Sequence, residues 1–549
     1  MANGNVGSPD PNQLRLILIE LFNLSELKDI SFALKVDYDL LAGEDGQQLM
    51  MRVGEDIWKP NEDLAKIEPK GGKDILTTID IDIQDITEEA LYRAVDRHRA
   101  NHGVAIVMEV KTGAIRAISN IGRTTEGNLW ETYNFAVGSA TEPGSTFKLA
   151  TMLALLETGE VDLDDSIDIE QGRTQFYTDE MVDAYPHQLD STSVQRIFEM
   201  SSNVGMAKLV QKHFGDTNKE EKFIQQLKDF NLHLKTGIEI DGEGAPFIKE
   251  AFDKKNNWSG TTLPWMSTGY EVMLTPLQLL NFYNSVANDG TMVKPYLVSG
   301  IQEYGNTLDR FPPTVIKRKI ASKSSIEKAQ FLLEQVVENG TARKLKTDKY
   351  NFAGKTGTAQ VNYKRLNDRT RVGGYQASFV GYFPSEKPKY SCIVLISEPK
   401  KLGIYGGEVA LPVFREIADQ IFATKFDLQR PINAQPKEPL AKRQLPDYNV
   451  GDRLEMEYLL DVFQIPYQVT KASPIVMLRA ESDTLSVLPY TISKKRIPSV
   501  VGMGLRDALY VLENLGLRVE ISSGCGRVIK QSIKPGTPVR GQTVYLRLG

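Results

Sequence analysis

The strongest chemical signal in the sequence is a hydroxyl and an amine three residues apart, at Ser145 and Lys148. Pro143 suits the first turn of a helix and the apolar run Leu149 to Leu156 continues it, so both side chains are predicted on one helix face. A serine hydroxyl becomes a good nucleophile when a base removes its proton, and a desolvated lysine beside another cation can be that base. By itself, however, this spacing also fits an ordinary helix start.

Two later segments could complete a site for acyl chemistry. Ser201, Ser202 and Asn203 lie between two helical stretches and supply hydroxyls and an amide, although serine and asparagine are also common helix N-caps. The tetrapeptide Lys355 to Thr358 lies in a predicted strand, where its lysine adds positive charge and its hydroxyls can hold a carboxylate. Gly357 within it allows another backbone to approach closely.

The triplet Lys-Thr-Gly occurs three times, at Lys111, Lys235 and Lys355, so it means little alone. The first copy precedes Ser145 and fits a hairpin turn, and the second follows Asn203 too closely for a separate sheet strand. Only the third comes after both other motifs, with small residues around it in a strand. The ordered set S-x-x-K, S-x-N and K-T-G-T is therefore the specific signal.

The elements that must position these residues can also be predicted. The spacing of apolar residues predicts a helix over Ile81 to His98, followed by a hairpin of Gly103 to Val110 and Ala114 to Ser119 that turns at Lys111-Thr112-Gly113. Helices dominate as far as about residue 285. Three strands and a closing helix are then expected at Asn351 to Gln360, Gln376 to Phe383, Tyr390 to Ser397 and Leu411 to Ala423. This order implies an α/β (α+β) domain whose terminal segments share one sheet.

Composition excludes some functions. A chain of 549 residues should form two to four domains. Its formal charge is -6 and its acidic and basic residues are interleaved, so the sequence has no concentration of positive charge that would bind nucleic acid. Cys392 and Cys525 lie far apart, so neither a disulfide framework nor a metal cluster is expected. The apolar run Leu14 to Leu24 is about half the roughly 20 residues that a membrane span needs, and no secretory signal precedes it.

Helix-like stretches are expected around residues 14 to 32 and 46 to 55.

In this order the three motifs resemble the class B penicillin-binding proteins of the septal division type, which are transpeptidases without a glycosyltransferase domain. The resemblance covers roughly residues 40 to 425. The further matching segments are Leu76-Thr77-Thr78-Ile79-Asp80 with Gln84, Glu142-Pro143-Gly144, Gly269-Tyr270 with Leu274-Thr275-Pro276-Leu277-Gln278, and Ala377-Ser378-Phe379-Val380-Gly381-Tyr382-Phe383-Pro384. The implied fold is that of the penicillin-binding and serine β-lactamase-like domains, with a central antiparallel sheet and a helical subdomain.

The resemblance implies a catalytic role for four residues. Ser145 would be the nucleophile and Lys148 the base that activates it. Ser201 would relay a proton to the leaving amine, and Lys355 would hold the electrostatic balance. The implied reaction is the cross-linking of peptidoglycan stem peptides by a D,D-transpeptidase, through an acyl-enzyme and without a metal or cofactor.

The same resemblance implies how a substrate is held. Asn203 would bind the donor peptide backbone, and Thr356 and Thr358 would hold the terminal carboxylate of D-Ala-D-Ala, with Gly357 between them. The backbone N–H groups of Ser145 and Thr358 would form the oxyanion hole. β-Lactam antibiotics are expected to acylate Ser145, and division proteins are expected partners of the full-length form. An extracytoplasmic location with an inner-membrane anchor is implied, although the anchor is absent from this sequence.

Four segments are expected. Residues 1–72 would be a remnant of an N-terminal pedestal, 73–425 the transpeptidase domain, 426–495 a linker with a possible degenerate PASTA-like module, and 496–549 a PASTA domain. The PASTA resemblance depends on Ile497-Pro498-Ser499-Val500-Val501-Gly502-Met503, Ala508, Leu512, Gly516-Leu517 and Lys534-Pro535-Gly536-Thr537.

Two alternative functions stay open. A β-lactamase or D,D-carboxypeptidase would use the same hydroxyl and lysines but let water attack the acyl-enzyme. A non-catalytic β-lactam sensor or scaffold would use the PASTA-like tail to bind partners.

Overall fold

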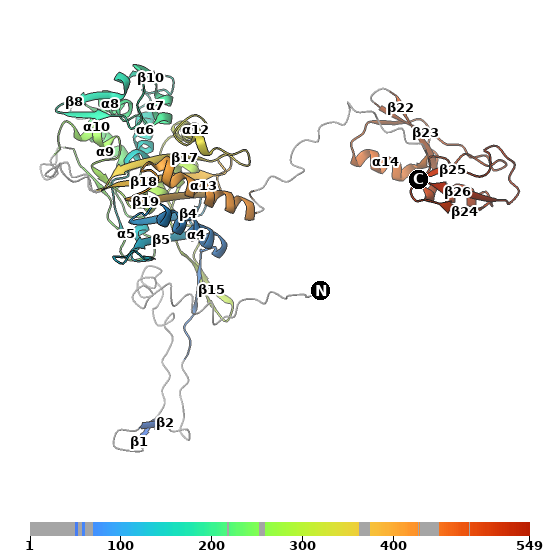
Figure 1. Cartoon of the computed structure of the whole chain (residues 1–549), viewed down its shortest axis with the longest axis horizontal. Coiled ribbons are helices and arrows are strands. Elements are labelled where there is room, and N and C mark those ends of the chain that lie inside the picture. The colour runs from blue at the N-terminus through green and yellow to red at the C-terminus, as the bar shows by residue number, and fades with distance from the viewer. Residues whose placement is uncertain are drawn as a thin grey trace. The chain divides into compact units, whose positions relative to one another are not determined.

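The chain divides into two compact units, Met1–Gln429 and Arg430–Gly549 (Figure 1). A computed structural model describes residues 50–52, 58–60, 70–216, 219–251, 258–361, 374–425, 428, 450–481 and 484–549. Each unit is described by itself below.

A six-stranded antiparallel sheet, in the order β17-β18-β19-β4-β5-β6, organises the first unit (Figure 1). Its strands are β4 (His102–Glu109), β5 (Ile115–Arg123), β6 (Leu129–Trp130), β17 (Ala353–Gln360), β18 (Tyr375–Phe383) and β19 (Tyr390–Ser397). The predicted hairpin is confirmed, with Gly113 at a φ of 80° in its turn. Strand β19 pairs with β4 along its whole length, so the predicted sharing of one sheet by distant segments is confirmed too.

Helices cover both faces of this sheet. Helix α4 (Ile81–Arg97) lies on the face of Ile396, because the space above Gly103 is filled by Leu91 and Val95 of α4 together with Ile396. Helix α13 (Gly406–Thr424) packs beside α4. The opposite face carries α5 (Phe135–Gly138) and α11 (Pro276–Ala287), where Asn284 accepts a hydrogen bond from Ser391 of β19. Burial on both faces explains the almost uninterrupted apolar runs of the central strands.

Part of the segment between β6 and β17 builds a helical subdomain, most of whose helices are labelled above the sheet in Figure 1. Its helices are η1 (Gly144–Phe147), α6 (Lys148–Glu157), η2 (Glu170–Gly172), α7 (Val194–Met200), α8 (Asn203–Phe214), α9 (Glu220–Asp229), α10 (Thr262–Met266), α12 (Lys323–Glu338) and η3 (Arg343–Leu345). Its short strands are β7 (Ser166–Asp168), β8 (Arg173–Phe176), β9 (Asp179–Val182), β10 (Ser191–Ser193), β11 (Phe247–Ile248), β12 (Val272–Met273), β13 (Met292–Val293) and β16 (Val315–Lys317). Strands β14 (Val298–Glu303) and β15 (Asn306–Arg310) form a separate sheet with β3 (Asp74–Thr77).

The helix expected around residues 46 to 55 is wrong at the residues that the structure describes there. Met50–Arg52 is strand β1, which pairs antiparallel with β2 (Trp58–Pro60), so pairing between the two segments replaces the expected helix. The helix expected at 14 to 32 lies outside the described residues. Within the described ranges, no helix has both the length and the hydropathy required to cross a membrane.

The second unit contains one topology twice. In the first copy, α14 (Arg453–Val462) precedes β21 (Tyr467–Val469), β22 (Ile475–Glu481) and β23 (Thr484–Pro489), with β20 (Gly451–Asp452) added at the edge. In the second, α15 (Leu505–Glu513) precedes β24 (Arg518–Ser523), β25 (Val528–Gln531) and β26 (Thr543–Leu548). In both copies the first and third strands after the helix pair in parallel, and the middle strand pairs antiparallel with the third.

A buried aromatic cluster fixes α13 on the sheet. The Phe414 ring lies 4.7 Å from that of Phe379, 5.7 Å from that of Phe352 and 5.9 Å from that of Phe383, measured between centroids. Phe414 is completely buried. It therefore joins α13 to β17 and β18, the strands that present the Lys-Thr-Gly-Thr segment.

We expect Phe414→Ala to lower the free energy of unfolding of the first unit by about 3 to 5 kcal/mol, because it leaves a cavity between α13 and the sheet. Urea denaturation followed by fluorescence measures this change. Phe331→Ala is the matched control, because Phe331 of α12 is 40% exposed. Equal losses in the two variants would show that the cluster does not anchor the helix.

Candidate active site

Ser145 lies in a tight turn that is held from several sides. It belongs to the 3-10 helix η1, directly before α6 begins at Lys148. Gly144 has a φ of 57°, and a Cβ there would come within 2.9 Å of the Ala359 Cβ atom in β17. The hydroxyl of Tyr283 donates to the carbonyl of the next residue, Thr146, at 2.7 Å. Ser145 is partly exposed, and its Oγ atom has no hydrogen-bond partner within the described ranges, so a substrate can reach it.

Lys148 is completely buried beneath this turn. Its Nζ atom donates to the backbone oxygen of Ser201 and to Oδ1 of Asn203, both at 2.7 Å, and lies 3.3 Å from Ser201 Oγ. Burial lowers the pKa of the Lys148 ammonium to about 7, and the negative charge of Asp183 acts in the opposite direction. At neutral pH a large fraction of Lys148 is therefore an uncharged amine.

Lys355 reaches the same hydroxyl from β17. Its buried Nζ atom donates to Ser201 Oγ at 2.8 Å and to the Thr356 carbonyl at 3.2 Å, and lies 5.9 Å from the centre of the Phe198 ring. Burial, followed by the charge of Lys148, holds the pKa of Lys355 well below its usual range. The Ser201 hydroxyl is thus the bridge between two amines that disfavour each other's positive charge.

The backbone at Ser201 turns through the left-handed region, with φ 59° and ψ 41°, where α7 ends. Asp183 holds the following turn. One carboxylate oxygen accepts from the backbone N–H groups of Asn203 and Val204 at 2.5 and 2.9 Å, and the other accepts from Ser202 Oγ at 2.6 Å. The His187 Nε2 atom lies 2.9 Å from that second oxygen. This buried carboxylate therefore fixes the start of α8 and hence the Asn203 side chain that Lys148 contacts.

Strand β17 is the edge of the sheet, so half of its backbone N–H and C=O groups point away from β18. A Cβ on Gly357 would lie 2.8 Å from the Thr146 Cγ2 atom, so only glycine lets η1 approach the strand this closely. The Thr356 hydroxyl is hydrogen-bonded to the Thr341 hydroxyl at 2.7 Å, and Thr358 Oγ1 accepts from the Gly406 N–H at 3.1 Å. The Thr358 hydroxyl proton stays available to a ligand.

The structure brings together most of the residues singled out in the sequence. Lys148, Ser201, Asn203 and Lys355 are joined by direct hydrogen bonds. No hydrogen bond joins Ser145 Oγ to Lys148 Nζ in the described structure, where the lysine donates to acceptors on the Ser201 turn. The two other Lys-Thr-Gly copies lie elsewhere: Lys111 in the β4–β5 turn pairs with Asp289, and the backbone N–H groups of Thr236 and Gly237 donate to Glu243.

Several residues around the site carried no role in the sequence analysis. Asp183 and Thr341 belong to no motif, and His187 had no ligand-like neighbours along the chain. Glu142 belongs to a segment that matches the family, but its partner, the N–H of Glu271 at 2.9 Å, lies far away in sequence. Burial raises the pKa of Glu142 to about 7, the Glu271 N–H lowers it, and the Glu271 charge raises it further. Only the three-dimensional structure identifies these partners.

Comparisons with known proteins agree with this geometry. The chain is 28% identical over 391 residues to "Probable peptidoglycan D,D-transpeptidase PenA" of Neisseria meningitidis, which covers 69% of this chain and 62% of that protein. The chain thus spans less than two thirds of the length of that relative. It is 26% identical over 523 residues to "Stage V sporulation protein D" of Bacillus subtilis, covering 91% of this chain and 69% of that protein.

A solved structure, penicillin binding protein 3 of Mycobacterium tuberculosis in complex with aztreonam, is similar with a TM-score of 0.57 and 25% identity. The match covers 72% of this chain and 84% of that one. The family profile described as PASTA domain matches residues 495–549, and the profile described as penicillin binding protein transpeptidase domain matches residues 103–419. Since the second match takes in more than half of the sequence, the chain belongs to the penicillin binding protein transpeptidase family.

Proposed function

We propose that the protein is a peptidoglycan D,D-transpeptidase that cross-links stem peptides through an acyl-enzyme on Ser145. One observation carries the proposal: Lys148 and Lys355 are buried and share the Ser201 hydroxyl, next to a serine whose Oγ atom is open to a substrate. Such an arrangement can remove a proton from one oxygen and deliver it to a leaving amine without a metal.

In the first half-reaction, Ser145 Oγ attacks the carbonyl carbon of the penultimate D-Ala while neutral Lys148 takes the hydroxyl proton. The negative charge that develops on the carbonyl oxygen is stabilised by the N–H groups of Ser145 and Thr358, an interaction worth about 3 to 4 kcal/mol per donor in other acyl-transfer enzymes. The C–N bond then breaks, and the leaving D-Ala amine receives its proton through Ser201. Lys355 lowers the cost of charge movement along this path.

In the second half-reaction, the amine of a neighbouring stem peptide attacks the ester carbonyl. The amine loses a proton to the same relay, the ester C–O bond breaks, and Ser145 recovers its hydroxyl. The free edge of β17 supports this scheme, because an extended peptide can pair with it as an added strand. Asn203, Thr356 and Thr358 are the proposed contacts of the donor, with its carboxylate beside the two threonines and Gly357 between them.

We further propose that the protein acts outside the cytoplasm, where peptidoglycan is cross-linked, and that the full-length form is membrane-anchored. Proteins of the division machinery are its proposed partners, on the strength of the resemblance to the septal type. β-Lactams are proposed to acylate Ser145 in place of D-Ala-D-Ala.

We also propose that residues 450–490 are a second PASTA-type module, in addition to residues 495–549. The support is the shared topology of the two copies, helix first and then three strands with the same pairing. Val450 and Ile475 of the first copy are buried in one cluster with Val500 and Leu512 of the second. The two modules would therefore unfold together.

The remaining proposed boundaries are 1–72 for a pedestal remnant and 73–425 for the transpeptidase domain.

Intact-mass spectrometry after incubation with benzylpenicillin tests the proposed function. We expect one adduct on the wild type and none on Ser145→Ala, because the acyl-enzyme requires the serine oxygen. Ser191→Ala is the control, since Ser191 is an exposed residue of β10 outside the site. An adduct on Ser145→Ala would place the nucleophile elsewhere, and no adduct on any variant would favour a scaffold. An adduct lost within minutes, rather than hours, would favour the hydrolase.

The rate of acylation should fall as the pH drops below about 7, because protonation of Lys148 removes the base. Asp183→Asn removes a negative charge that raises the pKa of Lys148, so the midpoint of this decline should move to lower pH. The maximal rate should fall as well, because an amide cannot accept all the hydrogen bonds that the carboxylate accepts. Stopped-flow acylation across the pH range measures both effects.

Two controls test whether Lys148 sets the midpoint of the pH dependence. Asp164→Asn changes an exposed aspartate away from the site and should leave the midpoint in place. Glu142→Gln removes another group whose pKa is about 7, so the decline should persist in that variant if Lys148 causes it. A midpoint that stays fixed in Asp183→Asn, or moves to higher pH, would contradict the assignment of Lys148 as the base.

A further inference from the structure

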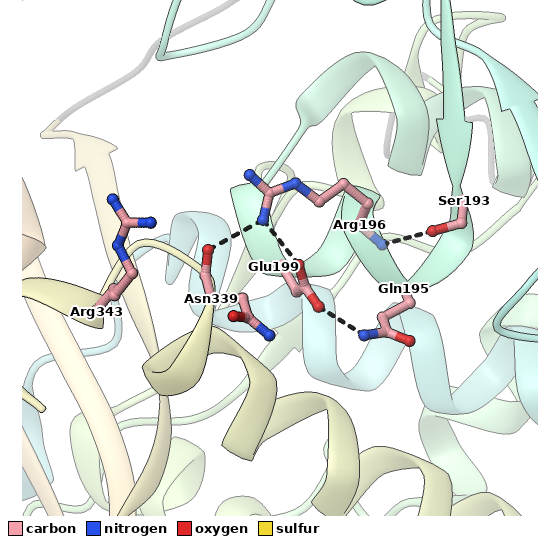
Figure 2. A pocket seen from close by; sticks show the side chains of 6 residues that line it. All are labelled: Ser193, Gln195, Arg196, Glu199, Asn339 and Arg343. Atoms are coloured by element: carbon pink, nitrogen blue, oxygen red, sulfur yellow. Dashed lines mark hydrogen bonds and ion pairs between the residues drawn. The ribbon is translucent and has the colours of Figure 1, made fainter.

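A polar cavity lies between α7 and the segment that follows α12, apart from the Ser145 turn (Figure 2). Its volume is about 440 Å³, and it is broadly open to solvent. It is lined by Ser193, Gln195, Arg196, Glu199, Asn339 and Arg343. In the view of Figure 2, the guanidinium groups of Arg196 and Arg343 lie on either side of the Asn339 carbonyl group.

Arg343, an exposed residue, supplies a second positive charge to the cavity. Arg196 donates to Glu199 at 2.8 Å and to the Asn339 carbonyl at 3.0 Å, so the Glu199 charge is balanced within the wall. Arg343 forms neither an ion pair nor a side-chain hydrogen bond with any residue that the structure describes. An arginine fork of this kind matches the two oxygens of a carboxylate.

The amide side chains of the wall add a preference for a ligand that donates hydrogen bonds. Gln195 donates through Nε2 to Glu199 at 2.7 Å, and Asn339 donates through Nδ2 to Gln335 at 2.7 Å. Their side-chain oxygens are therefore left to accept hydrogen bonds from a ligand. A ligand that fits has a carboxylate for Arg343 and N–H groups for the two amides, which is the chemistry of a short acidic peptide.

We propose that this cavity binds a carboxylate-bearing peptide and that its occupancy changes the rate of acylation at Ser145. The proposal depends on the proposed function for the source of the ligand, because uncross-linked stem peptides are peptides of this class.

Two short connections link the cavity to the active site. Glu199 lies in α7, two residues before Ser201, and its backbone oxygen accepts from the Thr341 N–H at 3.2 Å. The hydroxyl of the same Thr341 is hydrogen-bonded to that of Thr356 in β17 at 2.7 Å. A ligand that contacts Arg343 and Asn339 therefore touches the segment on which both Ser201 and Thr356 depend.

Calorimetric titration of the full chain with N-acetyl-Ala-Glu tests the binding site, after benzylpenicillin has acylated Ser145. We expect saturable binding that Arg343→Gln weakens at least tenfold. Arg310→Gln, which changes an exposed arginine of β15, should bind like the wild type. No binding by the wild type, or equal binding by Arg343→Gln, would overturn the site. Inorganic phosphate binding as tightly as the peptide would overturn its assignment to a peptide.

Acylation of unblocked protein by a fluorescent penicillin tests the coupling. We expect saturating N-acetyl-Ala-Glu to change the rate at least twofold in the wild type and in Arg310→Gln, and to leave Arg343→Gln unchanged. An equal change in Arg343→Gln would assign the effect to peptide bound at Ser145 itself, and no change in the wild type would remove the coupling. Acylation without the peptide reports on the proposed function alone, so the two proposals can fail separately.

Discussion

Two amines without access to water converge on one hydroxyl oxygen, and the architecture around Ser145 depends on that contact. Burial disfavours the charged form of each lysine, and each charge disfavours the other, so the pair loses protons more readily than exposed lysines do. Such a pair costs free energy unless its donors find acceptors. The Ser201 carbonyl, the Ser201 hydroxyl and the Asn203 amide supply those acceptors.

The rest of the unit holds these groups in place. Asp183 fixes the turn that carries Ser201 and Asn203, and the aromatic cluster under α13 fixes the strand that carries Lys355. Glycine at position 357 lets that strand lie against the Ser145 turn. A fold with helices on both faces of one sheet suits this task, because the strand beside the site is supported from behind while its edge stays open.

Much of this arrangement could be predicted from the sequence, for identifiable reasons. The β4–β5 hairpin depends on local turn chemistry at Gly113, and the later strands are continuous apolar runs, so both could be predicted from short windows. The hydrogen bonds of Lys148 could not, because its acceptors lie on a turn more than fifty residues away along the chain. Asp183 was missed for a related reason. Its carboxylate caps a turn about 20 residues later in the chain, and no local pattern distinguishes it from the exposed acidic residues nearby. The segment at 46 to 55 was misjudged because strand pairing overrode helix-like spacing.

The pairing of β4 with β19 also constrains how the protein can be made. Ser391 bonds to the carbonyl of Met108 across a sequence separation of 283 residues, so the β4–β5 hairpin has an unpaired neighbouring edge until almost the whole unit has been synthesised. Long-range antiparallel pairing of this kind is slow, and an unpaired apolar edge invites association with other chains. During that interval the hairpin is the part of the nascent polypeptide that a holding chaperone would be expected to shield.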